Sequence, residues 1–162
     1  MTKNMLLIAA LVLSAAIFSC KKKDNCEDTM ISKEKLQGNW KENSSRYGAA
    51  AFRFRPEYLL MKFENDSFFI EMKSQTDAPT ISCPDTSWIE YTKGVFTREN
   101  STLLLKGIYT DSNHVIKTSG CHHIGAYNDS FKVDFCKPVL KLTWTSPGAV
   151  PETYRTIDMY KE

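Results

Sequence analysis

Residues 58–74 have the sequence YLLMKFENDSFFIEMKS, which predicts two strands and the turn between them. Tyr58–Phe63 and Ser67–Ser74 are rich in aromatic and aliphatic residues, which alternate with polar ones at Met61-Lys62-Phe63 and Ile70-Glu71-Met72-Lys73. Because successive side chains of a strand point to opposite faces, this period of two is typical of strands with one buried face. Asn65-Asp66 lies between the two runs, and both residue types tolerate the positive φ of a tight hairpin turn. The stretch therefore predicts an antiparallel hairpin.

The same pattern continues along the chain. Further strands are predicted around Trp40 and at 88–97, 102–110, 131–136, 139–145 and 153–161. Glu99-Asn100-Ser101 predicts another tight turn, and a single helical turn is predicted at 32–37. Eight or nine antiparallel strands within residues 36–162 predict an all-β fold. An up-and-down barrel and a strongly coiled sandwich both fit this strand count.

The N-terminus predicts export from the cytoplasm. Met5–Phe18 is apolar, follows Lys3 and ends just before Ser19-Cys20. This run is shorter than the roughly 20 residues that a membrane-spanning helix needs, and it has the length of a signal-peptide core. Either the cysteine is lipidated, or an ordinary secretory signal is cut just before a cysteine.

Ser19-Cys20 in this position resembles the lipobox of bacterial lipoproteins. The resemblance implies that residues 1–19 are removed, that Cys20 is diacylated, and that residues 20–35 form a flexible tether. Lys21–Lys23 at the start of the tether would lie well against anionic head groups. Members held at the inner membrane often carry Asp after the cysteine, so Lys21 favours the outer membrane of the cell envelope.

Charge and composition exclude some functions. Removal of residues 1–19 takes away one lysine and no acidic residue, so the formal net charge falls from +2 to +1. Nucleic-acid binding usually requires a strongly basic face, so a nucleic-acid partner is not expected. The sequence contains no Gly-rich phosphate loop, and we expect no cofactor.

Four cysteines remain once Cys20 is assigned to the lipid, and an even set predicts disulfides in an oxidising compartment. Tyr127-Asn128-Asp129-Ser130 has the composition of a tight turn. A hairpin folded about Asn128–Asp129 would place Cys121 opposite Cys136, which predicts that pair. Cys26 and Cys83 would then form the second pair by default, although a slip of one residue would remove the argument.

Gly38-Asn39-Trp40 in the first of eight antiparallel strands resembles the Gly-x-Trp motif of lipocalins. In that family an arginine near the end of the last strand packs across the tryptophan ring, and Arg155 is the residue that resembles it. The resemblance covers about residues 36–161 and implies a lipocalin-like barrel. It also implies that Gly38, Trp40 and Arg155 close the barrel through a cation–π contact.

A narrower resemblance connects the chain to a group of small bacterial lipoproteins whose members are sometimes labelled fumarate hydratase. It rests on residues 36–40, 90–94, 119–121 and 124–127. The chemistry of the sequence does not support that label. One class of that enzyme binds an iron–sulfur cluster on three cysteines in a far longer chain, and the other carries a Gly-Ser-Ser-x-Met-Pro loop that does not occur here.

Catalytic and metal sites are weakly indicated. Cys121-His122-His123 suggests a metal, but adjacent residues of a strand point to opposite faces, so we predict no metal site there. The sequence contains no Gly-x-Ser-x-Gly nucleophile elbow. Four carboxylates could supply the pair that a hydrolase uses, although alternating charges usually mark the wet face of a sheet. These four are Glu64, Asp66, Glu71 and Glu90.

These observations favour a non-enzymatic, lipid-anchored envelope protein of lipocalin-like form, for which a small apolar ligand is one option and a filled core the other. Aromatic residues could line a ligand cavity, or they could fill a small barrel completely. The residues are Trp40, Phe68, Trp88, Phe96, Phe131, Phe135 and Trp144. Two alternatives remain open: an interaction module with a packed core that binds another protein through loops such as 75–87, and a carboxylate-dependent hydrolase.

Overall fold

The computed structural model describes residues 26, 31–47, 57–145 and 154–162. The predicted signal peptide, the lipidation site Cys20 and most of the predicted tether lie outside these residues. Within the described residues, one short helix, α2 (Lys33–Leu36), precedes the strands. The strands are β1 (Gly38–Tyr47), β2 (Glu57–Glu64), β3 (Ser67–Gln75), β4 (Ser87–Glu99), β5 (Thr102–Thr110), β6 (Ala126–Cys136), β7 (Val139–Thr145) and β8 (Tyr154–Lys161).

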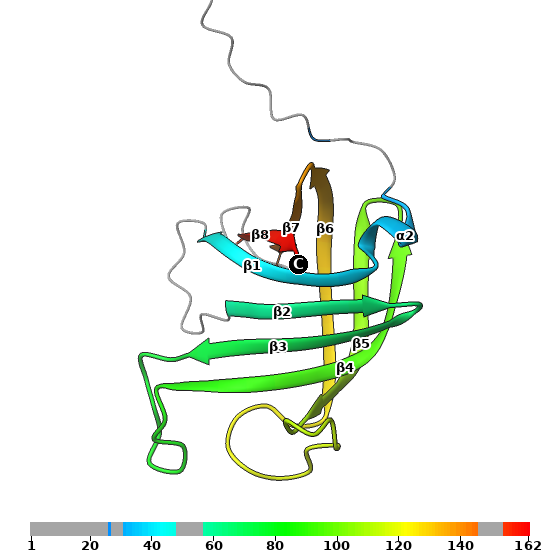
Figure 1. The fold of residues 1–162 in the computed structure, drawn as a ribbon. Coiled ribbons are helices and arrows are strands. Elements are labelled where there is room, and N and C mark those ends of the chain that lie inside the picture. Colours follow the sequence, from blue (N-terminus) through cyan, green and yellow to red (C-terminus); the bar gives the residue numbers. More distant parts are fainter. Residues whose placement is uncertain (1–25, 27–30, 48–56, 146–153) are drawn as a thin grey trace, which may run out of the picture.

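The eight strands form a closed antiparallel barrel in up-and-down order (Figure 1). Each strand pairs with its neighbours in sequence, and β8 pairs with β1 to close the barrel. The prediction of an all-β, up-and-down barrel is confirmed, and the sandwich is not what forms. Closure leaves no unpaired sheet edge, which removes the usual route to edge-to-edge aggregation.

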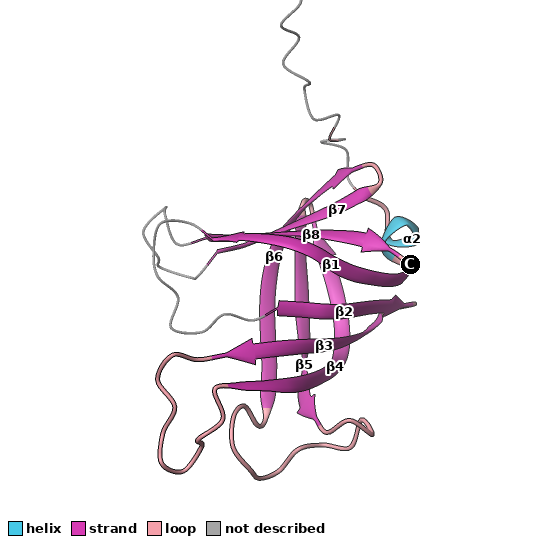
Figure 2. Cartoon of the chain, turned by 60° about the vertical axis from the view of Figure 1, so that its left-hand side comes forward, coloured by secondary structure: helices cyan, strands magenta, loops and turns pink. Residues whose placement is uncertain are grey.

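The two ends of the barrel differ in their connections. At one end, here called the turn end, tight turns join β2 to β3, β4 to β5 and β6 to β7. Asn65 (φ 54°) and Asn100 (φ 56°) supply the positive φ in two of them, as predicted. At the opposite end, here called the loop end, residues 76–86 join β3 to β4 and residues 111–125 join β5 to β6 (Figure 2).

Helix α2 lies at the turn end. Gln37, directly after the helix, exchanges hydrogen bonds with the backbone of Asn65 in the β2–β3 turn, at 3.1 and 2.7 Å. Gly38 then enters β1 with φ of +112°, a conformation that favours glycine over other residues. The Trp40 indole N–H donates to the Leu36 carbonyl at 2.7 Å, and both side chains are buried. The Gly-x-Trp motif therefore joins the helix to the barrel.

A second pair of glycines brings two strands close together. Gly94 of β4 and Gly107 of β5 are directly opposed. A Cβ atom added to Gly94 would collide with the backbone of Lys106 and Gly107. The two strands can therefore approach this closely because neither residue has a side chain.

The apolar core is built from residues on the inner faces of the strands. Trp40, Phe63, Phe68, Phe131, Leu103, Leu105, Leu140, Leu142, Ile157 and Met159 are each 1% exposed or less. Edge-to-face contacts join several rings, including Phe63 and Phe96 with centroids 5.1 Å apart. In β7, Leu140 and Leu142 face inward with Trp144 packed against the core, as the alternation predicts.

The predicted disulfide pairs are wrong, although all four cysteines are bonded. Cys26 pairs with Cys136 (Cα–Cα 4.0 Å), and Cys83 pairs with Cys121 (Cα–Cα 5.5 Å). The predicted hairpin about Asn128–Asp129 does not form, because both residues lie within the uninterrupted strand β6. Cys121 therefore lies at the loop end and Cys136 at the turn end. The turn-like composition is overridden by interactions inside the barrel that satisfy the Asp129 carboxylate.

The predicted contact between Trp40 and Arg155 is also wrong. Trp40 is opposite Lys161 in the β1–β8 pair, whereas Arg155 is opposite Tyr47 at the other end of the seam. The cation over the Trp40 ring is the Lys161 ammonium, 5.7 Å from the centroid. Arg155 stands near the start of the last strand instead of its end, so its side chain enters a different layer of the barrel.

Candidate binding site inside the barrel

The barrel interior changes from apolar to polar along its axis. On seven of the eight strands, the inner face carries a buried or half-buried residue that is polar or is a tyrosine. This residue lies closer to the loop end than the fully apolar residues of the same face. Along β4, for example, Glu90 and Thr92 precede Phe96, and along β6, Tyr127 and Asp129 precede Phe131. The residues of this polar layer are Glu42, Tyr58, Ser74, Glu90, Thr92, Tyr109, Tyr127, Asp129 and Arg155.

Asp129 is the centre of one hydrogen-bonded group in the polar layer. The hydroxyls of Tyr58 and Tyr127 each donate to the same carboxylate oxygen at 3.1 Å. The Trp144 side chain also hydrogen-bonds to this carboxyl. Burial raises the pKa of Asp129 above its usual value, although the hydrogen bonds from the two tyrosines act in the opposite direction. Burial likewise raises the pKa of both tyrosines, so they remain hydrogen-bond donors.

Arg155 forms a buried ion pair with Glu42. One guanidinium nitrogen lies 3.0 and 3.1 Å from the two carboxylate oxygens, and the side chains are 3% and 5% exposed. The Tyr58 backbone N–H also donates to Glu42. The guanidinium lies over the Tyr58 ring, 4.9 Å from its centroid, which adds a cation–π contact. Arg155 therefore neutralises a carboxylate inside the barrel.

Glu90 is the centre of a second group, near the loop end of the barrel. Its side chain is 2% exposed, and the Ser74 hydroxyl donates to it at 3.0 Å. His123, from the β5–β6 loop, donates its backbone N–H at 3.1 Å and places Nδ1 3.0 and 3.1 Å from the two oxygens. The His123 ring also stacks on Tyr109, with centroids 5.1 Å apart and planes 15° from parallel.

The charges of Glu90 and His123 depend on each other. Burial opposes ionisation of Glu90, but the hydrogen bonds and charge of His123 outweigh it and lower the pKa of Glu90. The hydrogen bond to Glu90 raises the pKa of His123, against the effect of burial. The pair is therefore favoured as carboxylate and imidazolium.

The sequence candidates have different positions in the fold. Of the four carboxylates considered for a hydrolase, Glu90 faces the interior. Glu64 pairs with Lys62, Asp66 pairs with Lys33 in the β2–β3 turn, and Glu71 is opposite Tyr91 on the outer face. Asp129 was missed because its neighbours have the composition of a turn. The signal was present, since Tyr127 and Asp129 share the period-two face of Phe131 and Val133.

The histidines do not converge. His122 stacks on Trp88, with centroids 3.7 Å apart, and its Nε2 lies 3.9 Å from Asp85. His123 contacts Glu90, and His114 packs against Phe69. Within the described part of the chain, no group of three or more His, Cys, Asp or Glu side chains is arranged to hold a metal ion.

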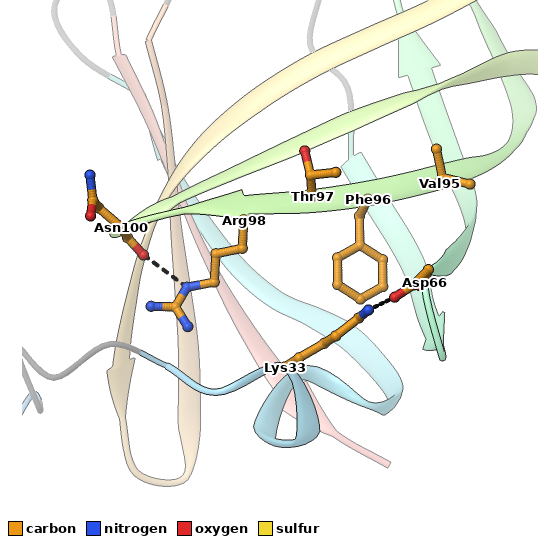
Figure 3. Close-up of a pocket in the computed structure, with 7 residues that line it drawn as sticks. All are labelled: Lys33, Asp66, Val95, Phe96, Thr97, Arg98 and Asn100. Atoms are coloured by element: carbon orange, nitrogen blue, oxygen red, sulfur yellow. Dashed lines mark hydrogen bonds and ion pairs between the residues drawn. The ribbon is translucent and has the colours of Figure 1, made fainter.

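A surface pocket of about 680 Å³ lies at the turn end of the barrel, between α2 and the β4–β5 hairpin (Figure 3). Lys33 pairs with Asp66 and lies 5.7 Å from the Phe96 ring centroid, while the Arg98 Nε–H donates to the Asn100 carbonyl at 2.8 Å. Val95 on its wall is 53% exposed. A small molecule bound in this surface pocket would stay largely exposed to solvent, so we take the barrel interior as the candidate site.

Comparison with protein-family models, with curated proteins and with solved structures found no match. Among the residues that the structure describes, no helix is long and apolar enough to cross a membrane.

Proposed function

We propose that the protein is a lipid-anchored, non-enzymatic protein of the cell envelope, and that its barrel binds a small molecule through the loop end. The short apolar run before Ser19-Cys20 supports the anchor, and the lack of Asp after Cys20 favours the outer membrane. The mature chain would be held by the acyl chains on Cys20, with the barrel as its binding domain.

The observation that carries the binding proposal is the polar layer. Burial of a polar group costs free energy unless the group is hydrogen-bonded, so a barrel that needs only stability would be filled with apolar side chains. Here the turn-end half is filled in that way, while carboxylates, tyrosines and an arginine occupy the loop-end half. This arrangement favours a ligand with polar groups over the purely apolar ligand expected from the sequence.

Native mass spectrometry of the protein purified from its own envelope would test the binding proposal. A small molecule that co-purifies with the wild type, and is lost from the Asp129→Ala variant, would support a site in the polar layer. Wild-type protein that carries no adduct, and gains none when incubated with an envelope extract, would contradict it. Lys106→Ala is a matched control, because Lys106 is exposed on the outer face.

The anchor has a separate test. The Cys20→Ser variant should leave the membrane fraction or accumulate as an uncleaved precursor, because the lipid can no longer be attached. A Cys20→Ser protein that loses its signal peptide and still partitions into detergent like the wild type would exclude lipidation at Cys20.

One observation favours the second candidate, an interaction module. Exposed aliphatic side chains gather on the two described loops of the loop end: Ile81 (102% exposed), Val115 (60%), Ile116 (57%) and Ile124 (49%). The Cys83–Cys121 disulfide joins these two loops. If they bind a protein partner, replacing Ile81 and Ile116 with Ser should abolish a defined cross-linked complex in intact envelopes while leaving the ligand adduct unchanged.

A further inference from the structure

The surroundings of the Glu90 carboxylate resemble a cation-binding site that is already occupied more than they resemble a structural ion pair. It is almost fully buried, and among the described cationic side chains the one that contacts it is His123. A buried carboxylate without a counter-charge is costly, so this site requires a cation. The His123 side chain is 46% exposed and belongs to a loop, so this positive charge reaches Glu90 from the solvent side.

The shape of the site is matched to a flat cation. The imidazole lies face to face with Tyr109 while its Nδ1 points at both oxygens of Glu90. A flat ligand whose positive charge lies in the plane of its ring would contact the same face of Tyr109 and the same carboxylate of Glu90. Cations over tyrosine rings gain further from the negative face of the ring.

A second observation indicates unused binding capacity at the same place. Thr92 lies two residues from Glu90 on the same inner face, directly opposite Tyr109 in the β4–β5 pair. Its side chain is fully buried, and its hydroxyl has no hydrogen-bond partner in the described part of the chain. Further into the barrel, Tyr109 meets Tyr127 edge-on at 5.6 Å, and Tyr127 donates to Asp129. Ring and hydrogen-bond contacts thus connect Tyr109 to the second carboxylate, Asp129.

We propose that Glu90, Thr92 and Tyr109 bind a planar organic cation, of the amidinium, guanidinium or imidazolium class, and that His123 occupies this site in the free protein. The inference rests on the proposed function and gives the chemical class of its ligand. The ligand displaces the His123 ring from Glu90 and Tyr109, donates to the carboxylate, and reaches the Thr92 hydroxyl.

Because His123 occupies the site in the free protein, the affinity for the organic cation depends on pH. The groups that face His123 are Glu90 of β4, Tyr109 of β5 and Lys117 of its own loop. At low pH the protonated imidazole competes with the ligand for Glu90. As the pH rises through the folded-state pKa of His123, the competitor loses its charge while Glu90 stays ionised, so the cation binds more tightly.

The experiment is calorimetric titration of the full-length, detergent-solubilised protein with benzamidinium, at about pH 6 and about pH 8.5, on either side of the range in which histidine titrates. Benzamide and benzoate serve as neutral and anionic probes of the same shape. The variants are His123→Ala, which removes the occupant, and Glu90→Gln, which removes the carboxylate. His114→Ala is the control, since His114 belongs to the same loop but packs against Phe69 outside the site.

We expect wild type to bind benzamidinium more tightly at the higher pH. His123→Ala should bind about tenfold more tightly at low pH, which corresponds to about 1.4 kcal/mol, and should show little pH dependence. Glu90→Gln should lose the binding, and His114→Ala should match wild type. Equal affinity in wild type and His123→Ala at both pH values would overturn the inference.

The probes protect the test against a Glu90→Gln variant that fails to fold. If benzamide or benzoate binds wild type and His123→Ala as well as benzamidinium does, the cation preference is wrong while a small-molecule site at the loop end stands. If none of the three probes binds either protein, the inference is also wrong. The proposed function fails separately, when envelope-purified wild type shows no adduct and gains none from an envelope extract.

Discussion

The turn-end and loop-end halves of the barrel share one strand pattern and bury different chemistry. Toward the turn end, Phe63, Leu103 and Leu140 fill the interior, and helix α2 lies at that end. Toward the loop end, the inside of the barrel carries Asp129, Glu90 and their hydrogen-bond partners. The difference teaches that one pattern of strands can enclose two kinds of interior: an apolar half held by packing, and a polar half held by buried charges and hydrogen bonds, which is the candidate binding site.

The largest effect is expected from the ion pair in the loop-end half. Arg155→Met leaves the Glu42 carboxylate buried without its counter-charge and should lower the free energy of unfolding by about 3–5 kcal/mol. The measurement is denaturant unfolding of both proteins. The double variant Glu42→Gln/Arg155→Met should recover more than half of the loss, because the amide oxygen still accepts from the Tyr58 N–H. A single variant as stable as wild type would show that the pair is solvated.

The turn-end half should respond to lost volume instead of lost charge. Leu103→Ala removes a side chain that is 0% exposed and should cost about 2–4 kcal/mol, through lost apolar burial and the cavity left behind. Leu104→Ala is the matched control, because the next residue of β5 points to the outer face and is half-buried. Equal costs at the two positions would contradict the assignment of inner and outer faces.

The His123–Glu90 pair should stabilise the fold within a limited pH window. The pKa of Glu90 is lowered from 4.5, so its contribution is present above that value and is lost as the pH falls through the folded pKa. The pKa of His123 is raised from 6.5, so its contribution is present below that value and is lost as the pH rises through the folded pKa. The stabilisation should therefore be largest between about pH 4.5 and 6.5.

Unfolding of His123→Gln and wild type across pH measures this window. Because His123 is about half exposed, solvent screening limits the expected difference to about 1 kcal/mol. The difference should shrink at alkaline pH, and His114→Gln, a histidine change in the same loop that leaves Glu90 untouched, is the control. A His123→Gln deficit that is constant from acid to alkaline pH would mean that packing on Tyr109, and not charge, stabilises the loop.

The smallest effect on stability is expected at the turn end of the β1–β8 pair. Lys161→Ala removes a cation over the Trp40 ring and should cost about 0.5 kcal/mol, the scale of an exposed cation–π contact. Lys106→Ala, exposed on the outer face of β5, should cost nothing measurable. If Lys161→Ala were as damaging as Arg155→Met, the two ends of the β1–β8 seam would not differ in the way proposed here.

Most of the fold could be predicted from the sequence, because local signals determine it. Period-two alternation predicts where the strands lie, and Asn65 and Asn100 predict two of the turns through their tolerance of positive φ. Tight turns between successive strands favour neighbours in space, so the up-and-down order follows. These signals require no knowledge of distant residues.

The candidate site could not be predicted in the same way, because it depends on distant contacts. Asn128-Asp129 has the local composition of a turn, but hydrogen bonds from Tyr58, 71 residues away, and from Tyr127 keep Asp129 inside a strand. That error moved the predicted hairpin and both disulfides with it. Arg155 was assigned to Trp40 because its position in the last strand was taken as near the end, whereas register places Lys161 there.

The Cys26–Cys136 bond has a mechanical consequence for the anchored protein. Without it, the chain between a lipid on Cys20 and the first described residue of the continuous fold, Ile31, could extend to about 40 Å. The bond fixes Cys26 to the turn end, so the segment between Cys20 and Cys26 spans six residues and reaches at most about 20 Å. If Cys20 is lipidated as proposed, the barrel is thus held close to the bilayer with its turn end facing the lipid surface. The loop end, with the proposed binding site, then faces away from the lipid surface and toward the surrounding solution.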